Sequence, residues 1–473
     1  MKNHMAAGWF YSPEQIKQYL MSRVISLKPP KTALDNPVTV LRQVNRHQWL
    51  MFLCGFLCWV WDAVDFFTVS LSLTEIAKDF GVPNSDVSWG ITVSLMLRSV
   101  GALTFGAFAD QYGAKWPMIV AMLLFVVLEL ASGFCQTLPQ FLAVRSLYGI
   151  AMGVFYRALV PTTSHGWRSL FWFAAVPPLL LIVFRLAMPE ANHFQAIKAE
   201  REARVNERQD GNELVPPTNK MSIVAFAKEA GKAVKDNWVL LIYMVVLMTG
   251  FNSCSHGSQD FFPTFLKNQV QLDATNVTVI SIVGQLGSIT GGTILGFVST
   301  FSGRRLIMLI ACVMGGALVP AYILPRSTSL VVSAFFEQVF VGGVWGPIPI
   351  YLMELSPVAL RTTVIGLTYQ LGNLASSASA TIQAIIGEQF PLSPGPTGEK
   401  RFDYGKVIAI FMAAVWGYVF IFLLLGPEMS QEERDKEAEA VRSLERKRQE
   451  RKINVRSEKQ AVEEHTVDTI EEV

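Results

Sequence analysis

The chain has 473 residues, of which 51% are hydrophobic and only 16% charged, whereas an ordinary soluble domain has roughly 25% charged residues. Such a composition cannot cover a soluble surface of this size with polar groups, and a net charge of +2 offers no basic field for nucleic acid. A soluble enzyme, a disordered regulator and a nucleic-acid-binding protein are therefore poor interpretations.

Long apolar runs follow one another along the chain, and a helix needs about 20 apolar residues to cross a bilayer. Backbone polar groups must pair internally in lipid, so these runs are predicted to be helices. The lipid bilayer is thus the first predicted partner of the chain. The eleven predicted spans are 49–72, 87–108, 117–137, 138–156, 168–187, 238–262, 277–299, 305–325, 329–353, 362–387 and 405–426.

Lysine and arginine gather in three segments, residues 1–47, 188–236 and 427–473. An excess of basic residues marks cytoplasmic loops, so we expect both terminal tails and the central segment on the cytoplasmic side. These segments flank an N-terminal half, 48–187, with five spans and a C-terminal half, 237–426, with six. Lysines in the tails could accept ubiquitin, so a ubiquitin ligase is a further candidate partner.

A loop motif occurs twice, after the second and after the seventh span. Its two copies read Gly106-x3-Asp110-x2-Gly113-x-Lys115 and Gly296-x3-Thr300-x2-Gly303-Arg304-Arg305. The motif resembles the signature loop of the major facilitator superfamily. That superfamily has two six-helix halves, and the substrate binds between them near the middle of the membrane.

Two further motifs extend this resemblance, one in the fourth span and one after the tenth helix of the family. They read Arg145-x3-Gly149-x3-Gly153 and Glu354-x2-Pro357-x3-Arg361. The resemblance implies an all-α polytopic membrane protein with a major facilitator fold of two pseudo-symmetric helix bundles. Asp110, Glu354 and Arg361 lie at predicted cytoplasmic helix ends, where we expect them to gate the conformational change.

The first half has one span fewer than the second. Five crossings from a cytoplasmic N-terminus would place the basic central segment outside, and this half has no counterpart of the Glu354-x2-Pro357-x3-Arg361 motif. We infer that roughly 40–50 residues, enough for one helix with its loops, are absent near Tyr156–Arg157. A natural deletion, a splice variant and a mistaken gene model would all look alike.

The sixth span carries a polar stripe at helical spacing, formed by Asn252, His256, Asp260 and Thr264. Such a stripe would be very costly against lipid, so it must face a cavity or a partner helix. Histidine changes charge near neutral pH, and a carboxylate one turn away suits the pair to carrying a proton. The neutral side chains offer hydrogen bonds to a small polar solute. The alternative is a structural polar cluster between helices.

The stretch from Asn252 to Thr264 also matches the pattern Asn-x-x-(Ser/Thr)-His-x-(Ser/Thr)-Gln-Asp-x-x-x-Thr at every defined position. It resembles the hallmark of fungal lactate/pyruvate proton symporters, within the sialate:proton symporter group. The resemblance implies proton-coupled uptake of short monocarboxylates (lactate, pyruvate, acetate, propionate) across the plasma membrane. It implies proton coupling by His256 and Asp260. The candidate substrate-binding residues of this stretch are Asn252, Ser255, Ser258, Gln259 and Thr264.

Three more candidates for substrate binding lie in other spans. Arg98 is in the second span, and a buried guanidinium needs an anion, which a monocarboxylate could supply by bidentate pairing. The alternative is an ion pair with Asp62, Asp65 or Glu129, and the two aspartates could themselves be proton sites. Gln370 and Asn373 share one helix face and resemble the family's eleventh-helix run. Amide packing between helices is the alternative there.

The same residues leave two other functions open. One is transport of another organic anion, such as a dicarboxylate or sialic acid. The other is a truncated sensor or remnant that does not transport, for which the absent helix is the main argument. No nucleotide-binding loop or metal-ligand cluster is found in the sequence, so no cofactor, metal or enzymatic activity is indicated.

Overall fold

The computed structural model describes residues 13–25, 27, 42, 45–112, 115–151, 168, 176–187, 219–356, 361–394 and 400–427. The chain forms two compact units. One comprises Met1–Lys31 with Pro427–Val473 and contains helix α1 (Pro13–Ile25), and the other comprises Thr32–Gly426. The fold described below is that of the second unit.

Helices make up nearly all of the described residues of this unit, as the apolar runs predict. The first half contains α3 (Arg46–Phe80), α4 (Asn84–Tyr112), α5 (Lys115–Phe134), α6 (Leu138–Ala151) and α8 (Val176–Ala187). The second half contains α10 (Asn219–Gln259), α11 (Phe262–Asn268), α12 (Ala274–Ser302), α13 (Arg304–Ile323), α14 (Leu330–Gly343), α15 (Ile348–Leu355), α16 (Arg361–Ser376), α17 (Ser379–Gly387) and α18 (Tyr404–Leu425). A short hairpin pairs β1 (Pro391–Leu392) with β2 (Arg401–Phe402) before α18.

Each of the eleven predicted spans overlaps one or two of these helices. The spans 138–156 and 168–187 do so only over 138–151 and 176–187, because 152–156 and 169–175 lie outside the described residues. Within the described residues, five segments are long and apolar enough to cross a membrane, and all five lie in the second half. They are Trp238–Asn268, Ala274–Ser302, Arg304–Ile323, Leu330–Leu355 and Tyr404–Leu425.

Specific residues set the helix boundaries. Helix α3 begins at a capping box between Asn45 and Gln48 and ends at Gly81, whose φ of 67° is the left-handed conformation that glycine accepts easily. Gly303 of the repeated loop has a φ of 94° where α12 turns into α13. The glycine of that motif is therefore required by the backbone of the turn.

Three spans are broken near their middle. The sixth predicted span is interrupted between Gln259 and Phe262, where Pro263 at the start of α11 cannot continue the preceding helix. Pro347 separates α14 from α15, and the serine-rich stretch around Ser377 separates α16 from α17. Broken helices of this kind frequently border binding sites in transporters, because they free backbone groups and re-aim side chains.

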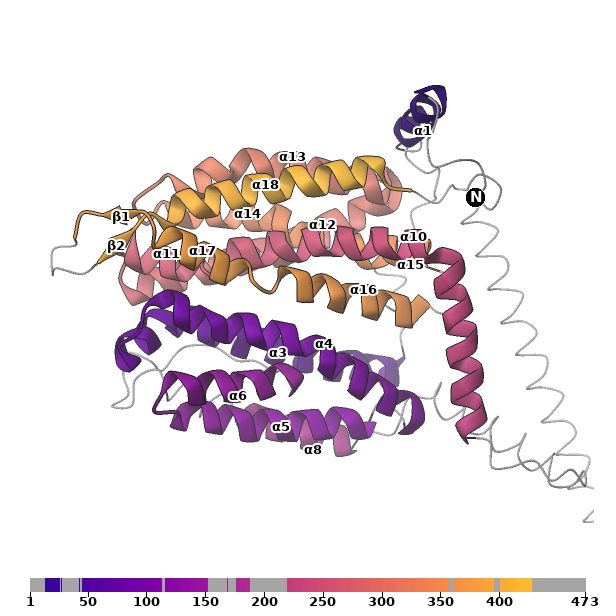
Figure 1. Cartoon of the computed structure of the whole chain (residues 1–473), viewed down its shortest axis with the longest axis horizontal. Coiled ribbons are helices and arrows are strands. Elements are labelled where there is room, and N and C mark those ends of the chain that lie inside the picture. The colour runs from indigo at the N-terminus through magenta and orange to yellow at the C-terminus, as the bar shows by residue number, and fades with distance from the viewer. Residues whose placement is uncertain are drawn as a thin grey trace, which may run out of the picture. The chain divides into compact units, whose positions relative to one another are not determined.

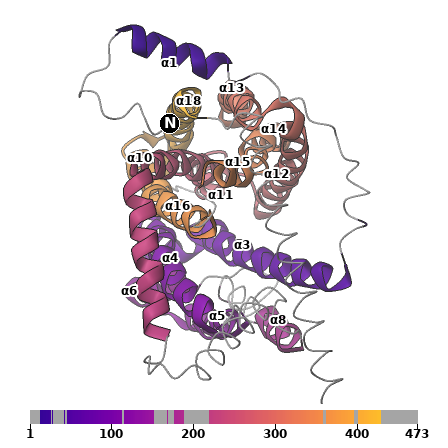
Figure 2. The same cartoon turned by 90° about the vertical axis from the view of Figure 1, so that its right-hand side faces the viewer.

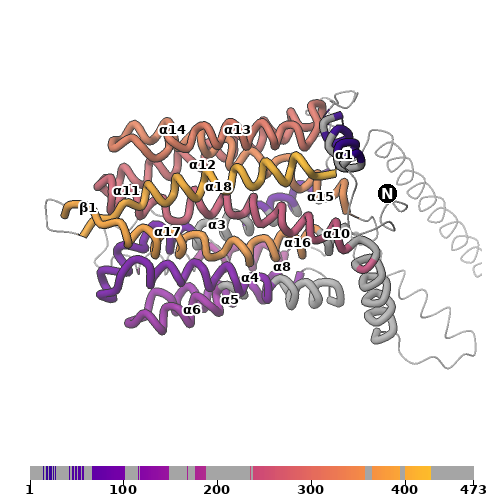
Figure 3. Tube along the Cα trace, turned by 45° about the horizontal axis from the view of Figure 1, so that its top comes forward, coloured from indigo at the N-terminus to yellow at the C-terminus, as the bar shows by residue number. Residues whose placement is uncertain are grey.

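The helices form two bundles (Figures 1 and 2), α3–α8 in one and α10–α18 in the other. Helix α4 packs on α16 and α17 of the other bundle, and these helices lie side by side in Figure 3. In the second bundle, α12 packs closely on α14 because its glycines allow it. A Cβ atom on Gly291 would lie only 1.9 Å from the carbonyl oxygen of Val339.

Helix α4 packs on two helices of the other bundle, whereas one face of α12 has no such partner helix among the described residues of the first bundle. Ile282, Leu286 and Ile289 expose 50%, 52% and 66% of their surface along this face. The repeated loop follows both α4 and α12, so these two helices correspond in the two halves. Because α4 packs on the fifth helix of the second half, α12 would pack on the fifth helix of the first, which is the helix inferred to be absent.

Candidate functional site

A cavity of about 860 Å³ lies between the two bundles. Phe67, Leu95 and Arg98 line it from the first bundle, and α10, α12, α14, α15 and α16 line it from the second. It gathers most of the residues that the sequence singled out, although they come from three separate helices. The predicted site residues in its wall are Arg98, Asn252, Ser255, His256, Gln259, Asp260, Gln370 and Asn373.

The centre of the site is a chain of three side chains, Asp260, His256 and Asn373. Nδ1 of His256 lies 2.8 Å from Oδ2 of Asp260, and its Nε2 donates to Oδ1 of Asn373 at 3.2 Å. Only 2% of the Asp260 side chain is exposed. Both imidazole nitrogens of His256 have partners, and the donor and acceptor roles in this chain depend on whether the pair holds a proton.

Amide groups around this centre leave polar atoms without partners. Nδ2 of Asn252, Oε1 of Gln370 and Nδ2 of Asn373 are buried and make no hydrogen bond to the protein. Buried polar atoms cost free energy unless they find a partner, and all three residues line the cavity. The site can therefore hydrogen-bond a small polar solute. Arg98 lines it from α4 and acts electrostatically on His256.

A close approach of α16 to α10 brings Asn373 to His256. It depends on Gly372, because a Cβ atom there would lie 2.8 Å from the backbone carbon of Met248 and 2.9 Å from Nδ2 of Asn252. The glycine of the Tyr-Gln-Leu-Gly-Asn run thus has a steric reason.

Ser255, Ser258 and Gln259 form hydrogen bonds within the second bundle. Ser255 accepts from Nε1 of Trp345 at 2.8 Å, and Gln259 donates to Oε1 of Gln338 at 2.8 Å. Gln338 in turn donates to Ser258 at 3.1 Å. Ser255 and Gln259 also line the central cavity, whereas Ser258 does not.

Thr264 lies apart from the other members of the predicted stripe. Because the helix breaks after Gln259, Thr264 belongs to α11 and is 1% exposed, and it does not line the cavity. The assumption of one continuous helix from Asn252 to Thr264 is therefore wrong. Only Asn252, His256 and Asp260 of the stripe share the cavity.

Of the three predicted gating residues, Glu354 is the one whose side chain the structure describes. Glu354 lies 3.5 Å from Nε of Arg304, so the second copy of the loop motif holds the end of α15. Asp110 and Arg361 lie at the ends of α4 and α16, but their side chains are outside the described part, as are those of Asp62 and Asp65. Glu129 pairs with Arg145 at 3.5 Å.

Residues that sequence reasoning missed complete the wall. They are chiefly Trp345, Tyr369, Gln285 and Ser288. Trp345 directly precedes Gly346 and Pro347, and this helix-breaking pair inside an apolar run is the signal that could have marked it. No signal within α12 distinguishes Gln285 and Ser288 from ordinary polar residues.

Polar contacts between the bundles cluster at the end that carries the α3–α4 turn. Lys267 binds Glu75 at 2.7 Å, and the Glu388 carboxylate accepts from the backbone nitrogen and hydroxyl of Ser85 at 3.0 and 2.7 Å. Thr92 and Thr381 are 2.8 Å apart. The cavity extends the other way, to Leu352 near the end of α15. The bundles are therefore joined at one end of the cavity.

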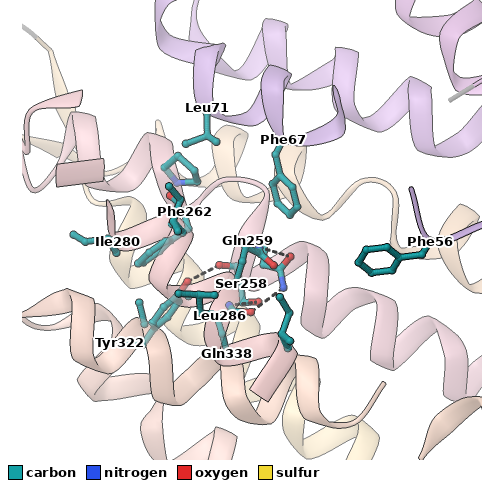
Figure 4. Close-up of a pocket in the computed structure, with 17 residues that line it drawn as sticks. Phe56, Phe67, Leu71, Ser258, Gln259, Phe262, Ile280, Leu286, Tyr322 and Gln338 are labelled. Atoms are coloured by element: carbon teal, nitrogen blue, oxygen red, sulfur yellow. Dashed lines mark hydrogen bonds between the residues drawn. The ribbon is translucent and has the colours of Figure 1, made fainter. Parts of the chain in front are cut away.

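A second, largely apolar cavity of about 480 Å³ adjoins the first (Figure 4). Phe67 and Leu71 of α3 face Phe262, with Tyr322 and Gln338 on the opposite side. The exposed Leu286 and Ile289 of α12 also line it. This side cavity lies at the same face of α12 that lacks a first-half partner.

Profiles of two transporter families match the chain. The "Major Facilitator Superfamily" profile matches residues 50–161, and the "Sugar (and other) transporter" profile matches residues 156–436. The two matches meet at the place where a helix is inferred to be missing.

The "Carboxylic acid transporter protein homolog" of Saccharomyces cerevisiae is 35% identical over 463 residues, covering 88% of this chain and 74% of its own. The "Sialic acid transporter NanX" of Escherichia coli is 22% identical over 427 residues, covering 81% of this chain and 95% of its own. Among solved structures, the "Partially occluded inward open conformation of the xylose transporter XylE from E. coli" aligns with a TM-score of 0.60 and 13% identity, covering 81% of this chain and 99% of that one. These relatives are transporters, not enzymes.

The same alignments contain positions that no residue of this chain matches. The alignment with the yeast protein uses 88% of the 473 residues, about 416, so about 47 of its 463 positions have no counterpart in this chain. The alignment with the sialic acid transporter uses 81%, about 383 residues, and leaves about 44 of 427 positions without one.

Proposed function

Because the chain belongs to the major facilitator superfamily of membrane transporters, we propose that it carries short monocarboxylates together with a proton across the plasma membrane. Lactate, pyruvate, acetate and propionate are the candidate substrates. The observation that carries this proposal is the Asp260–His256–Asn373 chain in the wall of the cavity between the bundles.

Several properties of the cavity suit a carboxylate. Arg98 supplies a permanent positive charge, and Asn252 and Asn373 have N–H groups that lack a protein acceptor. The yeast relative is named for carboxylic acid transport, which supports the same substrate class. His256 and Asp260 are the proposed proton site.

A transport cycle follows from these roles. The His256–Asp260 pair takes up a proton from the side where the bundles have opened, and the carboxylate then pairs with Arg98 and the amides. Rocking of the bundles then closes that side and opens the cavity to the opposite side of the membrane. In this structure the Glu75–Lys267 and Ser85–Glu388 contacts close one side in this way. Symport with a proton cancels the charge of the anion, so a negative-inside potential does not oppose uptake. In the proposed orientation of the protein in the membrane, both terminal tails and the central segment, residues 188–236, lie on the cytoplasmic side.

The absent helix favours a second candidate, a remnant that does not transport. The exposed face of α12 and the adjoining side cavity are the observations for it, because they leave the interface between the bundles incomplete on one side. A different substrate, such as a dicarboxylate or sialic acid, is the other alternative.

Competition for uptake separates these possibilities. Cells expressing the chain, with and without the missing segment supplied, are given radiolabelled lactate. We expect unlabelled pyruvate, acetate and propionate to compete, and succinate and sialic acid to leave uptake unchanged. Competition by succinate or sialic acid alone would move the assignment to that substrate, and no uptake in either form would favour the remnant.

A further inference from the structure

The amide of Asn373 has two chemically different ends, and they face different partners. Oδ1 accepts from Nε2 of His256, while Nδ2 is buried and has no hydrogen-bond partner in the protein, in a residue that borders the cavity. Only 1% of Asn373 is exposed. The end that does not contact His256 is therefore a buried donor whose hydrogen-bonding capacity the protein leaves unused, beside the cavity.

This arrangement fixes the number of protons on the neighbouring pair. An amide oxygen only accepts, so Nε2 of His256 must carry a hydrogen. The contact between Nδ1 and Oδ2 of Asp260 then needs a second hydrogen, carried either by Nδ1 or by the carboxyl group. In both cases the pair holds one proton more than a neutral imidazole beside a carboxylate.

Loss of that proton changes which end of the amide His256 prefers. The hydrogen that remains on the imidazole is best placed on Nδ1, where it donates to the Asp260 carboxylate. Nε2 then presents a lone pair, which repels Oδ1 of Asn373 and attracts Nδ2. Rotation of the Asn373 amide by half a turn brings Nδ2 to face Nε2 of His256 in place of Oδ1. The terminal torsion of an asparagine side chain has two broad minima, so both orientations are accessible.

We propose that Asn373 couples proton binding to anion binding by this rotation. With the proton bound, its N–H group faces the cavity and can donate to a substrate carboxylate. Without the proton, its oxygen faces the cavity and repels the same carboxylate. Among the described side chains, the charged groups acting on His256 are Asp260 and Arg98 of α4. Arg98 stays charged throughout, so of these three groups His256 and Asp260 are the ones that titrate.

This proposal deepens the proposed function and rests on it, and the protons taken up per lactate test it. Calorimetry of lactate binding to the purified full chain, in buffers of different ionisation enthalpy, gives this number. We expect about one proton per lactate in the wild type at mildly alkaline pH. Asn373→Leu should bind lactate more weakly and take up less than about half a proton. Gln370→Leu, one turn away in the same wall, should weaken binding but keep the wild-type number.

An unchanged proton number in Asn373→Leu, or the same loss in Gln370→Leu, would overturn the coupling role. If the wild type binds lactate without a proton, the proposed symport fails instead. Imidazole ¹⁵N shifts of His256 decide the inference without any substrate. The neutral ring should carry its hydrogen on Nδ1, and a neutral ring with hydrogen on Nε2 would contradict the rotation. The His256→Gln spectrum assigns the signal.

Discussion

Insertion of the missing segment should turn this chain into an active lactate transporter. A segment of roughly 40–50 residues from the yeast relative, enough for one helix with its loops, would be inserted between Tyr156 and Arg157, a position outside the described residues. We expect uptake to rise from background to a sustained rate, because the new helix covers the exposed face of α12 and closes the side cavity. Radiolabelled lactate uptake at matched surface expression measures the effect.

A helix of the same length and composition but scrambled sequence is the control for this insertion. It restores an even number of crossings without the specific contacts to α12. Equal activity with the scrambled helix would show that only topology had been repaired. Full activity of the chain without any insertion would refute the inferred gap.

Replacement of His256 by alanine should abolish accumulation of lactate against a gradient in the helix-restored protein. A pH gradient of two units can drive roughly 100-fold accumulation with one proton per anion, and without the proton site the ratio should fall to about one. Slow exchange of labelled for unlabelled lactate could persist, since exchange needs no net proton movement. Accumulation ratios at external pH 4.5 to 7.5 measure this.

Two further variants sharpen the result. Asp260→Asn should affect the same step, and its effect should not add to that of His256→Ala, because the two side chains are 2.8 Å apart. Thr249→Ala is the matched control, since Thr249 lies on the same helix, donates to the backbone carbonyl of Val245 in that helix and is not among the residues that line the cavity. Accumulation that survives His256→Ala with an unaltered pH profile would move the proton site elsewhere.

The helices and several residues that line the central cavity could be predicted from the sequence, because their signals are local. Apolar length marks each span, and the spacing of Asn252, His256 and Asp260 puts them on one face. Thr264 was misplaced because the same spacing continues across Pro263, where the backbone breaks. Pro263 is the residue in the sequence that indicates this break.

Contacts between distant segments could not be predicted in this way. That Asn373 meets His256 depends on the register of α16 against α10, which Gly372 sets by allowing close approach. The pairing of Glu129 with Arg145 likewise depends on how α5 and α6 pack. Gln285 and Trp345 reach the cavity only because α12 and the α14–α15 break lie beside α10. Contacts of this kind become known only from the three-dimensional arrangement of the helices.

Lactate-driven proton movement tests the central claim most directly. The helix-restored protein is placed in liposomes that contain a trapped pH-sensitive dye, and lactate is added outside without any pH gradient. We predict that the interior acidifies as lactate enters, that a protonophore abolishes the pH change, and that His256→Ala shows none. Entry of labelled lactate into the same liposomes without internal acidification would contradict proton symport.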